Sequence, residues 1–292
     1  WQESLVGLWA GDEIPRRVAG RNVNNFNHYQ PMRIFGLNGI CLLMAFCLPE
    51  TPGEGFCAVK NTAFHAGESV TYQIYYTLAG IYIEAGQVNF SCRVEQLNDK
   101  PVYHIIAEGK TLPFYDHFYK VRDKYESFID TASLQPYKFL RSVREGDFQK
   151  KENISFNKTV GTAITNDGVY KVPPCVQDVL SAMYYARNLN FDQMRPGDKI
   201  QFFMFLDNQL YPSYIRYLGR EIIKTKYGKF HAIRFKPLLI KGTLFEAGEK
   251  MTVWVSDDPD HIPLRVESPV TVGSVKADLM DFRNRRVPLT SQ

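Results

Sequence analysis

The chain has 292 residues, of which 45% are hydrophobic and 14% aromatic, enough to bury the core of one large domain or of two modest ones. Its 35 basic and 31 acidic residues are scattered evenly and give a formal net charge of +4. This balance excludes the concentrated basic footprint of a nucleic-acid-binding protein, and no run of like charges forms an acidic or basic tail.

Residues 32–55 have the pattern of a secretory signal peptide. Met32-Arg33 precedes fifteen uncharged residues, and Gly53 and Gly55 supply the small side chains that cleavage before Phe56 requires. The apolar run is shorter than the ~20 residues of a membrane-spanning helix, so a retained anchor is the second interpretation. We therefore expect export.

Residues 1–31 show no clear periodicity and precede the methionine of this segment. We interpret them as an upstream extension that is not native to the protein, or else as a short cytoplasmic tail whose arginines suit the positive-inside rule. The remaining residues, 56–292, are predicted to form a single exported β domain.

The exported part keeps three cysteines, Cys57, Cys92 and Cys175. An odd number permits one disulfide and one free thiol in three alternative pairings, and the sequence does not choose among them. Large residues precede Cys41, Cys47 and Cys57, which disfavours lipidation of any of them.

From Gly67 onward, apolar and polar residues alternate in short runs that are typical of half-buried strands. The expected strands are 69–77, 87–94, 102–109, 121–130, 137–144, 151–156 and 160–165. The aromatic stretch 112–119 predicts a short helical crossing, and Asn166-Asp167-Gly168 predicts a tight turn.

One amphipathic helix is predicted over residues 176–187. Apolar side chains recur there at helical spacing: Val176, Val179, Leu180 and Met183. Asp178 in the first turn and Arg187 in the last complement the helix dipole. A helix of about twelve residues is marginal alone in water, so we expect the sheet to cover it.

A second series of strands is expected at 199–206, 211–218, 221–225 and 230–235, followed by a meander at 251–256, 264–267 and 275–279. The predicted fold is all-β and mainly antiparallel: one long curved sheet or half-barrel with a single helix packed in its concave side.

The common catalytic motifs are absent from the sequence: no Gly-x-Ser-x-Gly elbow, dinucleotide fingerprint, Walker loop or His-Glu-x-x-His. The six histidines lack ligand spacing, and Asp257, Asp258 and Asp260 fit a turn better than a cation site. We expect no metal and no cofactor, and the sequence favours a non-enzymatic protein without deciding the question.

Six residues are candidates for ligand binding: Asp178, Ser181, Tyr184, Tyr185, Arg187 and Trp254. Asp178, Ser181 and Tyr185 share one stripe of the predicted helix, where they could anchor a polar group at the mouth of a cavity between helix and sheet. A buried tyrosine hydroxyl bonded to aspartate is the simpler interpretation. Trp254 could stack on a ligand, although an apolar strand more often places a tryptophan in the core.

Several segments, in this order, resemble one family of exported bacterial proteins, catalogued as domain of unknown function 3108. They are Gly67-Glu-Ser-Val-Thr-Tyr72, Tyr119-Lys-Val-Arg-Asp-Lys-Tyr-Glu-Ser127, Asp178-Val-Leu-Ser-Ala-Met-Tyr-Tyr-Ala-Arg187, Thr225-Lys-Tyr-Gly228, Trp254-Val-Ser-Asp-Asp258, Ile262-Pro263 and Gly273-Ser274. The resemblance implies a signal peptide and a location in the periplasm or on the surface of a bacterium, without an established activity. The fold that this resemblance implies is similar to the curved half-barrels of lipoprotein localisation factors.

Three functions follow as hypotheses. The first is a non-enzymatic envelope protein that holds a lipid, an acylated protein or a glycan intermediate between sheet and helix. The second is a structural or interaction module with a filled core and an envelope protein as partner. The third is an envelope hydrolase that uses paired carboxylates, Asp178 or Asp257 with Asp258. Membrane contact is expected only through the N-terminal signal segment.

Overall fold

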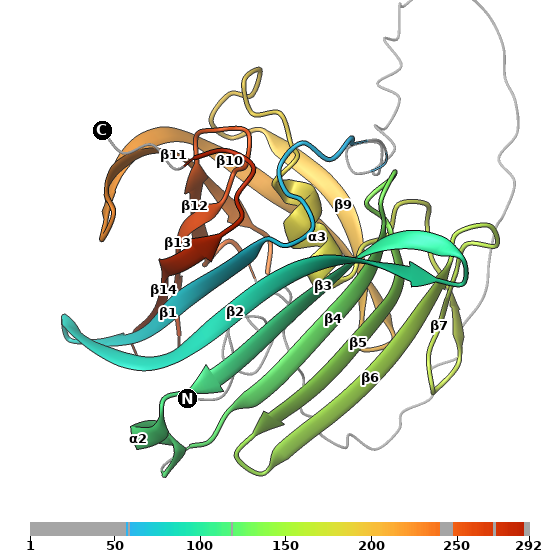
Figure 1. Ribbon diagram of the computed structural model, residues 1–292, viewed down its shortest axis with the longest axis horizontal. Helices are drawn as coiled ribbons and strands as arrows, with labels where there is room; N and C mark the ends of the chain where they lie inside the picture. Colours follow the sequence, from blue (N-terminus) through green and yellow to red (C-terminus); the bar gives the residue numbers. More distant parts are fainter. Residues whose placement is uncertain (1–56, 58, 118, 240–247, 271–272, 289–292) are drawn as a thin grey trace, which may run out of the picture. The chain divides into compact units, whose positions relative to one another are not determined.

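One antiparallel sheet of fourteen strands dominates the described part of the chain (Figure 1). The structure is a computed structural model, and it describes residues 57, 59–117, 119–239, 248–270 and 273–288. All of these residues belong to one of two units of the chain, Trp1–Glu13 with Pro52–Gln292. The expected signal peptide and upstream extension lie outside the described residues.

The strands form two arms. The first arm contains β1 (Ser69–Leu78), β2 (Ile81–Leu97), β3 (Lys100–Thr111), β4 (Arg122–Asp130), β5 (Pro136–Glu145), β6 (Phe148–Asn157), β7 (Thr162–Ile164) and β8 (Val169–Lys171). The second contains β9 (Lys199–Leu206), β10 (Gln209–Thr225), β11 (Gly228–Pro237), β12 (Thr252–Ser256), β13 (Pro263–Pro269) and β14 (Ser274–Arg283). Each arm is a meander, and the arms join where β1 pairs with β14, so β8 and β9 are the two ends of the sheet. The predicted fold class is confirmed.

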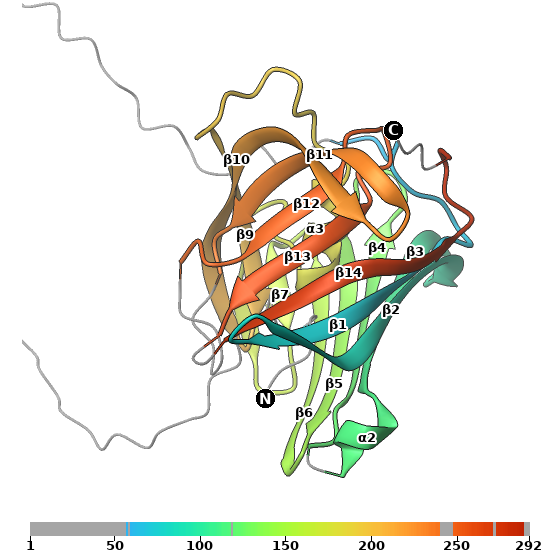
Figure 2. The same cartoon turned by 90° about the vertical axis from the view of Figure 1, so that its left-hand side faces the viewer.

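Two helices accompany the sheet within the described ranges, α2 (Pro113–Asp116) and α3 (Val179–Ala186). The one turn of α2 lies at the position where the aromatic stretch predicted a helical crossing. Figures 1 and 2 show the sheet curving around α3, which lies on its concave side. Among the residues described, no helix is long and apolar enough to cross a membrane.

The helix is shorter than the sequence predicted. Asp178 has an extended backbone and caps α3, while Val176 and Gln177 precede the helix. The backbone N–H of Gln177 donates to the carbonyl of Phe203 on β9 at 2.9 Å, and its carbonyl accepts from Phe205. Pairing with the edge of β9 therefore takes the residues that the apolar spacing assigned to a first helical turn.

Two further boundaries differ from the prediction. The strands expected at 211–218 and 221–225 are one strand, β10, because its pairing with β11 shifts register at Gly219, whose φ is +110°. Such a bulge accommodates an extra residue without ending the strand. The strand expected at 160–165 is reduced to β7, and the predicted turn at 166–168 joins it to β8.

Alternation along the strands builds the core. In β4, Asp123, Tyr125, Ser127 and Ile129 are buried while the residues between them are partly exposed. Seven of the eight residues of α3 are buried, all except Met183, which is half-buried. A helix this short is not stable alone, so packing inside the curved sheet stabilises it.

Ion pairs between the two arms stabilise the curvature of the sheet. Arg141 on β5 and Lys150 on β6 form ion pairs with Asp207, in the turn between β9 and β10, and Arg141 also pairs with Glu152 at 3.0 Å. A disulfide joins Cys57 to Cys175, just before α3, and leaves Cys92 as a buried thiol. The structure thus selects one of the three pairings that the sequence left open.

Candidate functional site

A small cavity lies between α3 and the concave face of β1, β2 and β11–β14. Its volume is about 70 Å³, and its lining is apolar except for Tyr72, Tyr184 and Arg187. Phe90, Val253, Val255 and Ala277 are among the sheet residues that line it, and Met183 closes it from the helix. Sites for drug-sized ligands enclose roughly 300–1,000 Å³, so the cavity is several times too small for such a ligand.

Arg187 anchors the C-terminal end of α3. Its Nη1 and Nη2 donate to the two carboxylate oxygens of Glu68, at 2.5 and 2.9 Å, and its Nε donates to the carbonyl of Asp260 at 3.0 Å. Both charged side chains are buried. Burial alone would lower the pKa of Arg187, but the Glu68 carboxylate outweighs burial and raises it above its ordinary value. This hydrogen-bonded pair fixes the helix to the segment before β1.

The two tyrosines of the cavity wall are neutral. The Tyr72 hydroxyl donates to the carbonyl of Pro263 at 3.0 Å, and burial raises the pKa of Tyr72. Burial likewise raises the pKa of Tyr184, whose ring packs edge-on against Phe64 with centroids 4.8 Å apart. Neither residue is poised to ionise near neutral pH.

Asp178 occupies the opposite end of the helix. Its carboxylate accepts from the Ser127 hydroxyl at 2.6 Å and from the backbone N–H of Ser181 at 2.8 Å, while the Ser181 hydroxyl accepts from the Asp178 N–H. Burial raises the pKa of Asp178 to about 7 against the effect of these hydrogen bonds. This is a capping box joined to β4, and it orders the first turn of α3.

The structure separates the six residues that the sequence grouped. Tyr184 and Arg187 line the cavity, whereas Asp178, Ser181 and Tyr185 are buried and are not part of its lining. Val253 and Val255 line the cavity, so Trp254 between them lies on the other face of β12, where its indole N–H donates to Glu221 at 2.5 Å. Asp178 and Ser181 of the predicted stripe thus form a helix cap joined to β4, and Trp254 belongs to the convex face.

Sequence reasoning missed the sheet residues of the cavity wall. Their signal was present in the alternation: Val70, Tyr72, Val253 and Val255 are the apolar members of strands that were predicted correctly. What the pattern lacked was the pairing of β1 with β14, which brings the two arms to one side of the helix.

The carboxylates proposed for hydrolysis do not share the cavity. Asp257 pairs with Arg220 at 2.9 Å, and Asp258 pairs with Arg285 at 3.0 Å. Asp258 Oδ1 also accepts from the backbone N–H groups of Asp260 and His261, as a turn-forming aspartate does. Asp178 is enclosed at the helix cap. In the described residues, no group of three or more His, Cys, Asp or Glu side chains is placed to hold a metal ion.

A second hollow lies outside the core, between β5–β7 and the segment 172–176. Its volume is about 280 Å³, with Pro136, Phe156, Pro173 and Lys158 in its lining. The Lys158 ammonium is already engaged, because it donates to Asp130 at 3.1 Å and lies over the Tyr137 ring, 3.8 Å from its centroid. The hollow therefore offers a ligand a mixed lining, with Gln135, Asn157 and Thr162 among its polar side chains.

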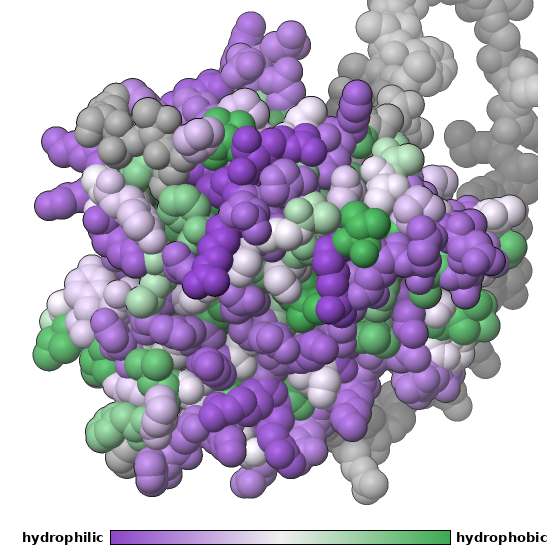
Figure 3. All heavy atoms as spheres, viewed as in Figure 1, coloured by the Kyte–Doolittle hydropathy of each residue, from purple (hydrophilic) through white to green (hydrophobic). Residues whose placement is uncertain are grey.

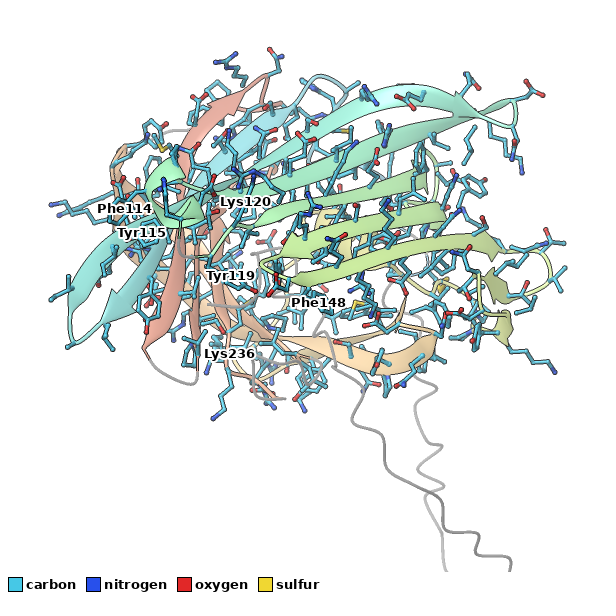
Figure 4. The ribbon with its side chains drawn as sticks, turned by 90° about the horizontal axis from the view of Figure 1, so that it is seen from below. Phe114, Tyr115, Tyr119, Lys120, Phe148 and Lys236 are labelled. Atoms are coloured by element: carbon cyan, nitrogen blue, oxygen red, sulfur yellow. A yellow bond between two sulfur atoms is a disulfide. The ribbon has the colours of Figure 1, made fainter. Side chains whose placement is uncertain are left out.

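Aromatic and basic residues gather at the end of the sheet that carries α2, which we call the α2 end. Figure 4 shows this end of the molecule, where Phe114 and Tyr115 belong to α2, Tyr119 and Lys120 follow it, Phe148 begins β6 and Lys236 lies near the end of β11. The loop is braced where Arg122 pairs with Asp116 at 2.5 Å and the Thr111 hydroxyl donates to Asp116 at 2.6 Å. These hydrogen bonds lower the pKa of Asp116 to about 2.

The fold and these sites define a class of open, barrel-like antiparallel β proteins with one buried helix. The family described as "Protein of unknown function (DUF3108)" matches residues 71–280, more than two thirds of the chain. The chain belongs to this family. No curated protein matches it.

Two solved structures are similar to the chain. A beta-barrel-like protein of the domain of unknown function DUF1849 from Brucella abortus has a TM-score of 0.51 at 8% identity, over 77% of this chain and 99% of that one. A putative exported protein with a YmcC-like fold from Bacteroides fragilis has a TM-score of 0.31 at 12% identity, over 78% and 100% of the respective chains. The first likeness shows a shared barrel-like fold.

Proposed function

We propose that the protein is an exported, non-enzymatic module of the bacterial cell envelope that acts through its surface, with α3 as a fixed part of the core. The signal-like pattern of residues 32–55 supports export. The disulfide between Cys57 and Cys175 supports an oxidising compartment, because such bonds persist outside the cytoplasm.

The observation that carries the proposal is the small space beneath α3. A cavity of about 70 Å³ leaves no room for a whole lipid chain or sugar, and the helix is held at both ends by buried hydrogen bonds. Opening the space would break the Arg187–Glu68 pair or the Asp178 cap. A protein built in this way presents its binding groups on the outside.

Native mass spectrometry of the protein recovered from a periplasmic extract tests the proposal. We expect the mass of the polypeptide alone, and no uptake of a fluorescent apolar probe such as N-phenyl-1-naphthylamine. A stoichiometric lipid or glycan that stays bound through purification would contradict it.

A second candidate function is the binding of an amphipathic ligand between sheet and helix. The apolar lining of the cavity favours it, because Arg187 and two tyrosines place polar groups at the wall of an otherwise apolar space. A lipid, an acylated protein or a glycan intermediate would enter by displacing α3 from the sheet.

One substitution separates the two candidates. Ala277→Val extends a cavity-lining side chain of β14 into the free space. If the cavity is a packing defect, filling it raises the free energy of unfolding by up to about 1 kcal/mol, with no bound ligand to lose. If the cavity holds a ligand, the variant lowers the affinity for the apolar probe. Ala107→Val is the matched control, since Ala107 is buried in the core but does not line the cavity.

A further inference from the structure

The α2 end of the sheet carries exposed apolar side chains on two projections. Ile81 and Tyr82, at the turn between β1 and β2, are 65% and 61% exposed, and Phe114 on α2 is 69% exposed. Figure 3 shows hydrophobic side chains at the lower left of this face, where Figure 1 places the β1–β2 hairpin and α2. Exposed apolar groups that gather on one end of a protein mark an interaction surface.

The hairpin extends past its neighbour in the sheet. β2 pairs with β3 only from Gly86 onward, so residues 81–85 extend beyond β3. The backbone N–H of Leu112, which precedes α2, donates to the carbonyl of Ala85 at 3.0 Å. The hairpin tip and α2 are therefore adjacent projections at one end of the molecule.

The composition of these projections suits a lipid surface. Residues 77–83 and 112–115 carry no charge. The hairpin pairs its own backbone, Thr77 with Tyr82 and Leu78 with Ile81, so burying the tip leaves few backbone groups unsatisfied. Tyrosine is enriched at the boundary between headgroups and acyl chains, and phenylalanine is common on the buried face of helices that lie there.

Charged residues of both signs adjoin the apolar tips in the chain, and the exposed Glu84 is the acidic one on the hairpin. Lys110 and Lys120 flank the α2 loop and are both exposed. Lys276 lies over the ring of Tyr82, with its ammonium 5.2 Å from the ring centroid, and pairs with Asp278 at 2.8 Å. Exposed lysines next to inserted apolar groups add attraction to anionic headgroups.

We propose that the α2 end docks on an anionic lipid surface, with Ile81, Tyr82 and Phe114 inserted at the headgroup level and Lys110 and Lys120 against the phosphates. A stable protein interface buries at least about 1,000 Å² in total, whereas these three side chains stand on two narrow, adjacent tips. The docking is independent of the N-terminal segment and of the cavity under α3, so its failure would leave the proposed function standing.

Vesicle binding with a probe placed at the tip tests the proposal on the full chain. Tyr82→Trp gives a fluorescence difference against the parent, which has three tryptophans of its own. We expect a blue shift of this difference with vesicles of phosphatidylethanolamine and phosphatidylglycerol, and quenching by lipids brominated near the headgroup. An unchanged difference spectrum would overturn the proposal even if the N-terminal segment binds the vesicles.

Two sets of variants separate insertion from charge. Ile81→Asp with Phe114→Asp should raise the lipid concentration that gives half of the maximal tip signal by about tenfold or more, because burial of apolar side chains supplies the affinity. Lys110→Gln with Lys120→Gln should remove the preference over vesicles of phosphatidylcholine alone.

Val160→Asp with Ile222→Asp is the matched control, since these side chains are 69% and 53% exposed but lie on other hairpins. It should leave the tip signal unchanged. An equal loss in the control, or a tip signal that responds to added envelope protein and not to lipid, would overturn the proposal.

Discussion

At the scale of single residues, Asp178 shows how a buried carboxyl serves structure at a free-energy cost. Its oxygens cap α3 and bond to Ser127, and no cation stands among the partners that oppose burial. Burial raises its pKa from the ordinary 3.8 to about 7. The unfolded chain therefore releases the Asp178 proton near pH 4, whereas the folded protein keeps it until about pH 7.

This shift predicts the sign of a pH dependence. Between about pH 4 and pH 7 the folded state holds the proton and the unfolded state does not, so the contribution of Asp178 to the free energy of unfolding falls as pH rises. Asp178→Asn keeps the cap and removes the titration, so the variant should gain stability relative to the parent by up to roughly 4 kcal/mol between pH 4 and pH 8. Urea unfolding across this range measures the difference.

Asp130 supplies a control of opposite sign. Burial would raise its pKa, but hydrogen bonds from Tyr137, the backbone N–H of Ala132 and Lys158 outweigh burial and hold the pKa below its ordinary value. Asp130→Asn should therefore lose stability relative to the parent at neutral pH and lose less as pH falls through 4. If both variants changed in the same direction with pH, the interpretation of Asp178 would be wrong.

Ala79 is a second residue with a testable cost. It has φ +48° in the β1–β2 turn and precedes Gly80, at φ +81°, so both central residues are left-handed, as in the turns that favour Asn-Gly. Ala79→Asn should raise the free energy of unfolding by about 0.5–1 kcal/mol, because asparagine tolerates this conformation better than alanine. Thermal or urea unfolding checks it, and Ala132→Asn, in an exposed turn without a positive φ, should give no such gain.

At the scale of elements, local patterns predicted the strands well and the ends of elements less well. The alternation of Val70, Tyr72 and Ile74 identified β1 because each residue reports the face it occupies. The prediction of a helical turn at Gln177 was wrong, because the backbone of this residue pairs with β9 and no local pattern reveals that partner. Gly219 joined two predicted strands because a bulge and a break have the same local composition.

The buried pair of Arg187 and Glu68, which tethers the end of α3 to the segment before β1, predicts a large coupling energy between these two residues. Arg187→Met leaves the Glu68 carboxylate buried without its partner and should lower the free energy of unfolding by about 3–5 kcal/mol. Adding Glu68→Leu should recover much of this loss, because two apolar groups replace a buried pair with little penalty.

A double-mutant cycle by urea unfolding measures that coupling. Arg283→Met is the control, because Arg283 is 77% exposed beside Asp281 and should contribute less than about 1 kcal/mol. Additive losses from the two buried residues would contradict the tether.

At the scale of the whole molecule, the information that the sequence withholds is long-range pairing. β1 and β14 are separated by almost the entire described chain, yet they pair as antiparallel neighbours and join the two arms into one sheet. Arg141 on β5 and Asp207 in the β9–β10 turn form an ion pair between the two arms, and no local periodicity of the sequence predicts such a contact. The candidate cavity was therefore predictable as a place between helix and sheet, but its lining and small volume were not.

The disulfide acts at this same scale, because it closes a covalent loop that contains all eight strands of the first arm. Cys57 and Cys175 are 118 residues apart, and a crosslink over such a loop restricts the unfolded chain by up to roughly 4–5 kcal/mol in the chain-entropy treatment. Reduction with dithiothreitol should therefore lower the urea midpoint of the parent. Cys57→Ala with Cys175→Ala should lower it equally and abolish the response to reductant.

Cys92 supplies the control. Burial raises the pKa of Cys92 to about 12, so its thiol stays protonated, and Cys92→Ala should respond to reductant as the parent does. A parent whose urea midpoint does not change on reduction would contradict a stabilising role for this disulfide.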